Sequence, residues 1–244
     1  MPYDVGMTTT GRRAAKRSEA RERLLSTASQ LFYSEGIAGV GVDRIVSEGH
    51  VTLATFYRHF PSKEDLVISY LEGVHEAIAE QITAATTQAP GPEDVRALGA
   101  QVVSELGQKG FRGCAFINAA SEYEDPDSPV RRVIASHRHW YYDTVRRAFD
   151  NAGHRHPGNA ARHFLMLRDG AMTGGYLDSS TTARRTFNRG VEGLLRSIDM
   201  TPLDPTDDGE EASGSESASS AARNAAGGLL GETRDRLSGA GHQP

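Results

Sequence analysis

The sequence contains a single cysteine, Cys114, and no long apolar run. One cysteine excludes an intrachain disulfide and fits a reducing compartment. No run approaches the roughly 20 apolar residues that a membrane-spanning helix needs, so we expect no membrane span. The amino terminus also lacks an apolar signal segment, and we therefore expect a cytoplasmic protein. The 244 residues are enough to bury one sizeable core or two small ones.

The chain also lacks an excess of positive charge, since its formal net charge is −5. This net negative charge lies entirely from Met200 onward, where 8 acidic residues stand against 3 basic ones. The first 199 residues balance, with 24 residues of each sign. The global charge therefore says little about partners. A local basic cluster near the amino terminus says more; it consists of Arg12, Arg13, Lys16 and Arg17.

Both ends of the chain have compositions that are typical of disorder. Residues 1–17 are polar and basic, and we expect them to form a disordered basic arm. Over residues 200–244, Gly, Ser, Ala and acidic residues dominate, and we expect a disordered acidic tail.

Between these ends, apolar residues recur at helical spacing. The first expected helix spans 18–35, and Gly36 is expected to end it in a left-handed conformation. A short helix over 42–48 follows. A third helix over 53–58 has Thr52 as its N-cap.

The fourth expected helix has the clearest start signal. Phe60-Pro61 ends the helix before it, because proline disfavours helical geometry in the preceding residue. Ser62 and Asp65 then have the spacing of a capping box, and the helix is expected to run as far as Pro90. No pattern of alternating strand residues stands out, so the fold is predicted to be all-α, with a small amino-terminal domain and a larger second one. Five further helices are expected over 93–109, 114–123, 129–151, 159–179 and 182–198.

The second and third helices form a candidate helix-turn-helix, in which the second of the pair lies in the DNA major groove. The residues expected to contact phosphates with hydroxyl, imidazole or ammonium groups are Thr52, Thr55, Tyr57, His59 and Lys63, and Arg58 belongs to the same interface. Backbone N–H groups at the start of the fourth helix offer a further phosphate site. The candidates for base contacts are Arg44, Leu53, Ala54 and Thr55, since arginine can pair with guanine and apolar side chains suit a thymine methyl.

A packed helical corner without DNA contacts is the alternative interpretation. Phe56 and Phe60 are expected in the core under either interpretation. Tyr57 and His59 would then be ordinary surface residues, and Arg44 is as readily a solvated charge as a base reader.

These segments resemble the helix-turn-helix of the tetracycline-repressor (TetR) family of bacterial regulators. The matching segments, with cap, stop, aromatic and basic residues in register, are 42–46, 55–60 and 62–66. The resemblance covers roughly residues 18–72. The sequence departs from the family at the turn, where His50 replaces a glycine and Gly49 stands one place earlier. The turn needs a positive φ, which histidine tolerates less well than glycine.

The resemblance implies that residues 18–66 bind DNA and that residues 67–199 bind a small-molecule effector and form a homodimer. The helices over 159–179 and 182–198 would form a four-helix interface with a second copy. The apolar residues expected on this face are Phe164, Leu165, Leu167, Ala171, Tyr176, Phe187, Val191, Leu194, Leu195 and Ile198. An intrachain core is the alternative use of the same face.

The effector site is expected around residues 113–123, which mix small, apolar and hydrogen-bonding side chains. The candidate wall residues are Cys114, Phe116, Asn118, Tyr123, Trp140, Tyr141 and Phe164. Ordinary helix packing is the alternative for each of them, and Cys114 fits a buried, inert thiol better than a redox sensor. The histidines lack matched ligand spacing, so we expect no metal and no cofactor.

Together these features predict a dimeric regulator, most simply a repressor, that binds a palindromic operator in double-stranded DNA and is released by an effector. A sequence-nonspecific architectural DNA-binding protein is one alternative. An enzyme using Cys114 or a histidine with a carboxylate is another, although no nucleophile, base and orienting group occur in a recognisable pattern.

Overall fold

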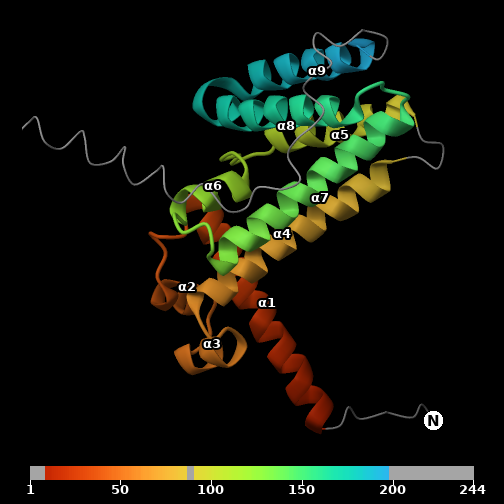
Figure 1. Ribbon diagram of the computed structural model, residues 1–244. Helices are drawn as coiled ribbons and strands as arrows, with labels where there is room; N and C mark the ends of the chain where they lie inside the picture. Colours follow the sequence, from red (N-terminus) through yellow and green to blue (C-terminus); the bar gives the residue numbers. More distant parts are fainter. Residues whose placement is uncertain (1–8, 87–90, 198–244) are drawn as a thin grey trace, which may run out of the picture. The chain divides into compact units, whose positions relative to one another are not determined.

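The computed structural model describes residues 9–86 and 91–197, with side chains described from residue 19 onward. Every element in these ranges is helical (Figure 1), which confirms the all-α prediction. The described residues belong to one compact unit. The disorder predicted for residues 1–8 and 200–244 lies outside the described residues.

The first helix, α1, spans Thr9–Glu35 and begins well before the predicted start at Ser18. The prediction of disorder is therefore wrong for residues 9–17. This stretch holds no proline and is rich in alanine, arginine and lysine, which favour helix, whereas its basic, polar character had suggested disorder. The helix ends as predicted at Gly36, which has a φ of +89° and donates its N–H to the Phe32 carbonyl at 3.1 Å.

Two short helices, α2 (Val42–Glu48) and α3 (Leu53–His59), pack against α1 and complete a three-helix domain. Thr52 caps α3, because its hydroxyl oxygen accepts a hydrogen bond from the Thr55 N–H at 3.2 Å. The buried residues that hold this domain together are Leu24, Ala28, Phe32, Ile45, Phe56 and Phe60.

Helix α4 (Lys63–Ala85) leaves the small domain and runs along α7 of the second one (Figure 1). Its start is a complete capping box: the Ser62 hydroxyl accepts from the Asp65 N–H at 3.1 Å, and the Asp65 carboxylate accepts from the Ser62 N–H at 2.9 Å. The predicted domain boundary between residues 66 and 67 thus falls inside one continuous helix.

The second domain contains the remaining helices. They are α5 (Pro92–Leu106), α6 (Ala115–Glu122), α7 (Pro129–Asn151), α8 (Pro157–Gly174), the π-helical turn η1 (Gly175–Ser179) and α9 (Ser180–Arg196). The expected helix over 159–179 is therefore α-helical only as far as Gly174. At Gly175 an added Cβ would lie 2.6 Å from a Leu106 methyl carbon, so the chain passes close to α5 where its helical winding changes.

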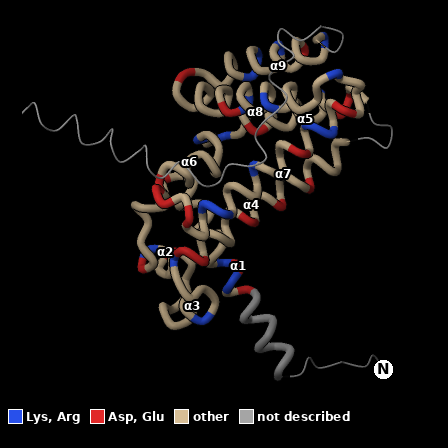
Figure 2. Tube along the Cα trace, viewed as in Figure 1, with Lys and Arg blue, Asp and Glu red and all other residues tan. Residues whose placement is uncertain are grey.

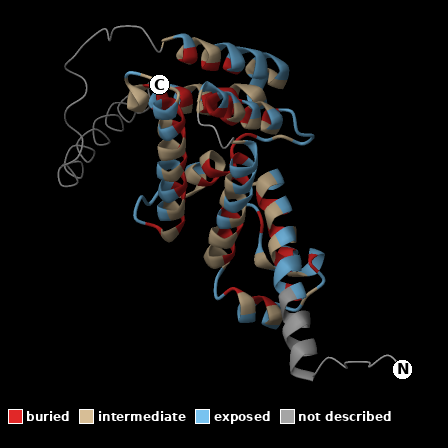
Figure 3. Ribbon diagram, turned by 90° about the vertical axis from the view of Figure 1, so that its right-hand side faces the viewer, coloured by how far each residue is buried: buried red, intermediate tan, exposed pale blue. Residues whose placement is uncertain are grey.

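Helices α8 and α9 form a hairpin over α5 and α7 (Figure 1), and their buried residues lie on the side facing those helices (Figure 3). The rings of Phe164 and Phe187 meet edge-on at 5.5 Å in this core. Five residues predicted for the dimer face are buried within a single chain, namely Phe164, Ala171, Phe187, Val191 and Leu195. Their assignment to the dimer face is wrong, because apolar spacing identifies the buried face of a helix but not what covers it. No described helix is long and apolar enough to cross a membrane.

Candidate functional site

The corner between α2 and α3 is held by tight backbone packing. His50 adopts a φ of +50°, the left-handed conformation predicted for this position. Gly49 is buried, and a Cβ there would lie 2.9 Å from the Ile45 carbonyl oxygen and 3.5 Å from the Thr27 hydroxyl. Glycine is therefore required at 49 by close packing, while the positive φ falls on His50. The unusual order of these two residues is compatible with an intact turn.

Most of α3 faces solvent around a buried anchor, Phe56. Leu53 and Tyr57 are 44% and 52% exposed, which is unusual for large apolar side chains in this structure. The other exposed residues of this face are Thr52, Ala54 and Arg58, with Thr55 and His59 half-buried. Figure 2 shows basic residues on α3 and on the described part of α1. The face predicted to enter DNA thus offers hydroxyl, phenol, guanidinium and small apolar groups together.

Several of these side chains are already ordered by one another. The hydroxyls of Thr52 and Thr55 lie 2.9 Å apart, and an Arg58 Nη2 donates to the Thr55 hydroxyl at 3.5 Å. The Tyr57 ring packs edge-on against Phe56 with centroids 5.2 Å apart. Such contacts reduce the side-chain freedom that binding has to remove.

Arg44 and Lys63 are differently placed from the rest of the predicted DNA-contacting set. The Arg44 guanidinium is hydrogen-bonded to both carboxylate oxygens of Glu35 and to Glu48. A base contact would require Arg44 to leave these carboxylates. The Lys63 ammonium donates to the Ile37 carbonyl at 2.6 Å and lies 5.9 Å from the centre of the Phe32 ring, and burial lowers its pKa. Lys63 therefore joins α4 to the end of α1.

The first turn of α4 carries two carboxylates, those of Glu64 and Asp65. Asp65 uses its Oδ2 to accept from the Ser62 N–H and hydroxyl. These negative charges reduce the positive potential at the helix start, which weakens the case for a phosphate site there.

Hydrogen bonds also join the small domain to the second one. Glu122, at the end of α6, accepts from the N–H groups of Ile37 and Ala38 at 2.9 and 2.5 Å. The Tyr33 hydroxyl donates to the Gly113 carbonyl at 3.0 Å and accepts from the Arg112 N–H at 2.9 Å. The sequence offered no local signal for these contacts, because the partners lie about 80 positions apart.

Of the residues predicted for the effector site, Cys114, Phe116 and Tyr141 line one small cavity with His137 and Arg168. Its volume of about 10 Å³ suits at most one water molecule. Asn118 instead donates to the Arg112 carbonyl at 2.9 Å, Tyr123 is partly buried, and Phe164 belongs to the core. Trp140 packs edge-on against His75, with centroids 4.6 Å apart.

Arg168 is a buried cation that sequence reasoning missed. It is 4% exposed, pairs with Asp169 at 3.1 Å, donates to the Cys114 sulfur at 3.5 Å and lies 4.9 Å from the centre of the Tyr141 ring. Burial raises the pKa of Tyr141 to about 12. An arginine in a helix is usually exposed, so its burial here could be found only from the packing.

A histidine pair lies beside this cluster. The Nδ1 atoms of His75 and His137 are 3.0 Å apart, and the His137 ring stacks on Phe116 with centroids 3.6 Å apart. Burial, reinforced by the nearby Arg168, lowers the pKa of His137 to about 3. Within the described ranges, no group of three or more histidine, cysteine or acidic residues could hold a metal ion.

A larger cavity of about 340 Å³ lies elsewhere, between α1, α4 and α5. None of the predicted effector-site residues lines it. Its wall includes Tyr70 and Gly73 of α4 and Gln101 and Glu105 of α5, the next helix along the chain. Only the packing of α5 against α4 brings them together.

This geometry defines a helical protein with an exposed recognition helix on a small domain that is joined to a larger helical one, which is the architecture of a DNA-binding regulator. Comparison with known proteins agrees with it. Residues 24–70 match the family of bacterial regulatory proteins described as the tetR family. SCO4454, a TetR-family transcriptional regulator from Streptomyces coelicolor, is 47% identical over 74% of this chain and 96% of its own, with a TM-score of 0.72.

Curated relatives are also transcriptional regulators of the helix-turn-helix type. YjdC of Escherichia coli is 23% identical over 72% of this chain and 93% of its own length. LmrA of Bacillus subtilis is 35% identical over 65 residues, so the chain matches about a third of that protein, 35% of its length. The chain belongs to the TetR family. It is a DNA-binding transcriptional regulator and not an enzyme, which removes the enzymatic alternative.

Proposed function

We propose that the protein is a homodimeric repressor that reads a near-palindromic operator through α3 and is released by a small-molecule effector. The observation that carries the DNA-binding mode is the exposed face of α3 on a tightly packed corner. Two such helices, about 34–36 Å apart, would enter successive major grooves on one side of the duplex.

Within this face, roles follow from chemistry. Thr52, Tyr57, Arg58 and His59 are suited to phosphates, which position the protein without reading sequence. Leu53, Ala54 and Thr55 are suited to base edges, with thymine methyl groups as the partners for the apolar pair. Arg44 joins them only if the DNA competes successfully with Glu35 and Glu48.

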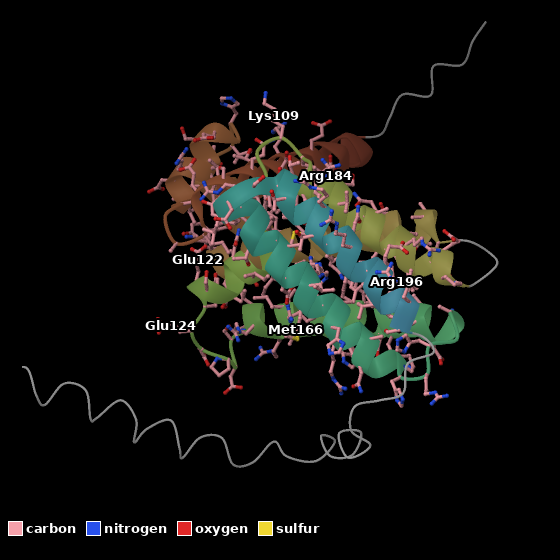
Figure 4. All side chains as sticks on the ribbon, turned by 90° about the horizontal axis from the view of Figure 1, so that it is seen from above. Lys109, Glu122, Glu124, Met166, Arg184 and Arg196 are labelled. Carbon is pink, nitrogen blue, oxygen red and sulfur yellow. The ribbon has the colours of Figure 1, made fainter. Side chains whose placement is uncertain are left out.

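The dimer is proposed to form through the outward face of α8 and α9, which lie at the front of Figure 4 with Met166 and Arg196 labelled. Met166 is 72% exposed and Leu177 is 69% exposed. Gly170 and Gly174 continue the same stripe of α8 at helical spacing, and a Cβ at either would meet nothing within 4 Å. A partner helix can therefore approach closely along this stripe. This face replaces the buried residues as the basis of the predicted four-helix interface.

Release is proposed to act through α4, which belongs to both domains. An effector that binds the second domain more tightly in a conformation with misplaced recognition helices would lower operator affinity, typically by a coupling free energy of about 1–3 kcal/mol. The hydrogen bonds of Glu122 with the small domain, and of Tyr33 on α1 with the second domain, supply further contacts through which such a change can pass.

The test is selection of genomic DNA fragments by the full-length protein at about physiological salt, where nonspecific binding is suppressed. A single enriched palindrome with half-sites one helical turn apart is the expected result. Protection of random and selected fragments to the same degree would instead favour the architectural alternative. A second selection with the Tyr57→Ala variant serves as the control for dependence on α3.

A further inference from the structure

The cavity between α1, α4 and α5, here called the α1–α4–α5 groove, has the dimensions of a ligand site. Its volume of about 340 Å³ lies at the lower end of the range for small-molecule pockets. Its apolar wall is formed mainly by Leu25, Val74, Ala77 and Ile78, and the ring of Tyr70 lies among them.

Among the described residues that line this groove, Glu105 is the only charged one. Its carboxylate accepts a hydrogen bond from Gln101 Nε2 at 3.4 Å, and within the described part of the chain it forms no ion pair. Arg168 on α8 acts on this carboxylate only through its charge, and it is itself paired with Asp169 and bonded to Cys114. Burial raises the pKa of Glu105, and a cation bound beside it would offset that cost and favour the carboxylate.

The groove also has a spare hydrogen-bond acceptor. Gln101 and Glu105 are four residues apart on α5 and share one face. The Nε2 group of Gln101 donates a hydrogen bond to Glu105. The Oε1 atom of the same side chain is buried and accepts no hydrogen bond. An N–H donor on a ligand would remove that deficit.

We propose that the effector is a small organic cation with an apolar body and an N–H donor, bound in the α1–α4–α5 groove with its charge at Glu105. This inference rests on the proposed function, whose effector it describes. The apolar body lies against Val74 and Ile78. An acid would meet the Glu105 carboxylate and no cation among the described lining residues, so we expect it to bind more weakly than a cation.

A ligand in this groove touches the DNA-binding domain directly. Leu25 and Ser29 belong to α1, while Gly73 and Val74 lie on the part of α4 beyond the small domain. Occupation of the groove therefore acts on the spacing of α1 and α5, with no relay through the core of the second domain.

Three probes with the same ring test the charge preference: tryptamine as the cation, tryptophol as the neutral analogue and indole-3-acetate as the anion. Their binding to the full-length protein is measured by calorimetry at neutral pH. We expect tryptamine to bind at least tenfold more tightly than indole-3-acetate. Glu105→Gln should weaken tryptamine at least tenfold and tryptophol less than twofold, whereas Glu80→Gln, an exposed charge on α4, should change neither.

A steric variant checks the location. Gly73 lines the groove and has nothing within 4 Å of an added Cβ, so Gly73→Leu should fold normally and weaken tryptamine and tryptophol alike. Equal binding of all three probes, binding of none, or equal effects of Glu105→Gln and Glu80→Gln would overturn the inference. The genomic selection is independent of these measurements, so an enriched palindrome without cation binding rejects this inference alone.

Discussion

Individual residues of this protein have roles that depend on how far packing has withdrawn them from solvent. Tyr57 and Leu53 are large and exposed on α3, where an isolated domain gains nothing from exposing them. His137 and Arg168 are polar and almost fully buried in the second domain. The first pair is available to a partner, and the second pair sets the stability of the fold.

Tyr57→Ala is expected to reduce operator affinity about tenfold or more, because each subunit of the dimer loses a phosphate contact worth about 1 kcal/mol. The melting temperature should hardly change, since the side chain is 52% exposed. Fluorescence anisotropy with the selected operator measures the affinity, and Tyr57→Phe separates the hydroxyl from the ring. Unchanged affinity in Tyr57→Ala would place the DNA contact elsewhere.

His137 should make the fold sensitive to mild acid. Its pKa is lowered to about 3 in the folded protein by burial and by Arg168, His75 and Arg138, so the unfolded chain binds its proton first. Above about pH 6.5 His137 costs the fold no stability. As the pH falls from there toward 3, the free energy of unfolding decreases by about 1.4 kcal/mol per pH unit. Between pH 7 and pH 5, the free energy of unfolding of His137→Gln should therefore fall by about 2 kcal/mol less than that of the parent.

Urea unfolding at the two pH values measures this difference, with His163→Gln as the control because His163 is exposed on α8. A parent protein and a His137→Gln variant with the same pH dependence would contradict the expectation.

At the level of elements, helix ends and close contacts decide the geometry of the DNA-binding corner. α2 ends at a buried glycine, α3 begins at a threonine cap, and α4 begins at a capping box. These signals are local, so the structure reproduces the predicted bounds of α2 and the predicted start of α3. The start of α1 was misplaced because charge and helix propensity point in opposite directions over residues 9–17.

A matched pair of glycine substitutions tests the packing of this corner. Gly49→Ala should destabilise the protein by about 1–3 kcal/mol, because the new Cβ would lie too close to the Ile45 carbonyl. Gly73→Ala, in the open interior of α4, should stabilise it by roughly 0.5–1 kcal/mol through helix propensity. Chemical denaturation compares the two, and a neutral Gly49→Ala would mean that the corner yields to the methyl group.

Across the whole molecule, the two domains are joined by one shared helix and by hydrogen bonds that cross between them. Glu122 accepts hydrogen bonds from the backbone of Ile37 and Ala38, and Tyr33 donates one to the loop before α6. A domain that moved freely on α4 would not keep such contacts. They restrain the small domain against the second one.

Glu122→Gln should weaken this connection by about 1–2 kcal/mol, since hydrogen bonds to a charged acceptor are stronger than neutral ones. Hydrogen exchange at the Ile37 and Ala38 amides is expected to accelerate, while exchange within α8 stays as in the parent. Glu124→Gln, an exposed carboxylate nearby, is the matched control. Equal protection of both amides in Glu122→Gln and the parent would show that the contact does not restrain the small domain.

The sequence by itself determined the helical class and the helix-turn-helix corner, because caps, stops and helical spacing are set by neighbours a few positions apart. It could not determine which apolar faces meet within one chain, so Phe187 and Val191 were assigned to a dimer. It also could not place Arg168 in the core or bring Gln101 and Glu105 against α4. Those features depend on how whole helices pack against one another, between residues tens of positions apart, and only the tertiary structure decides them.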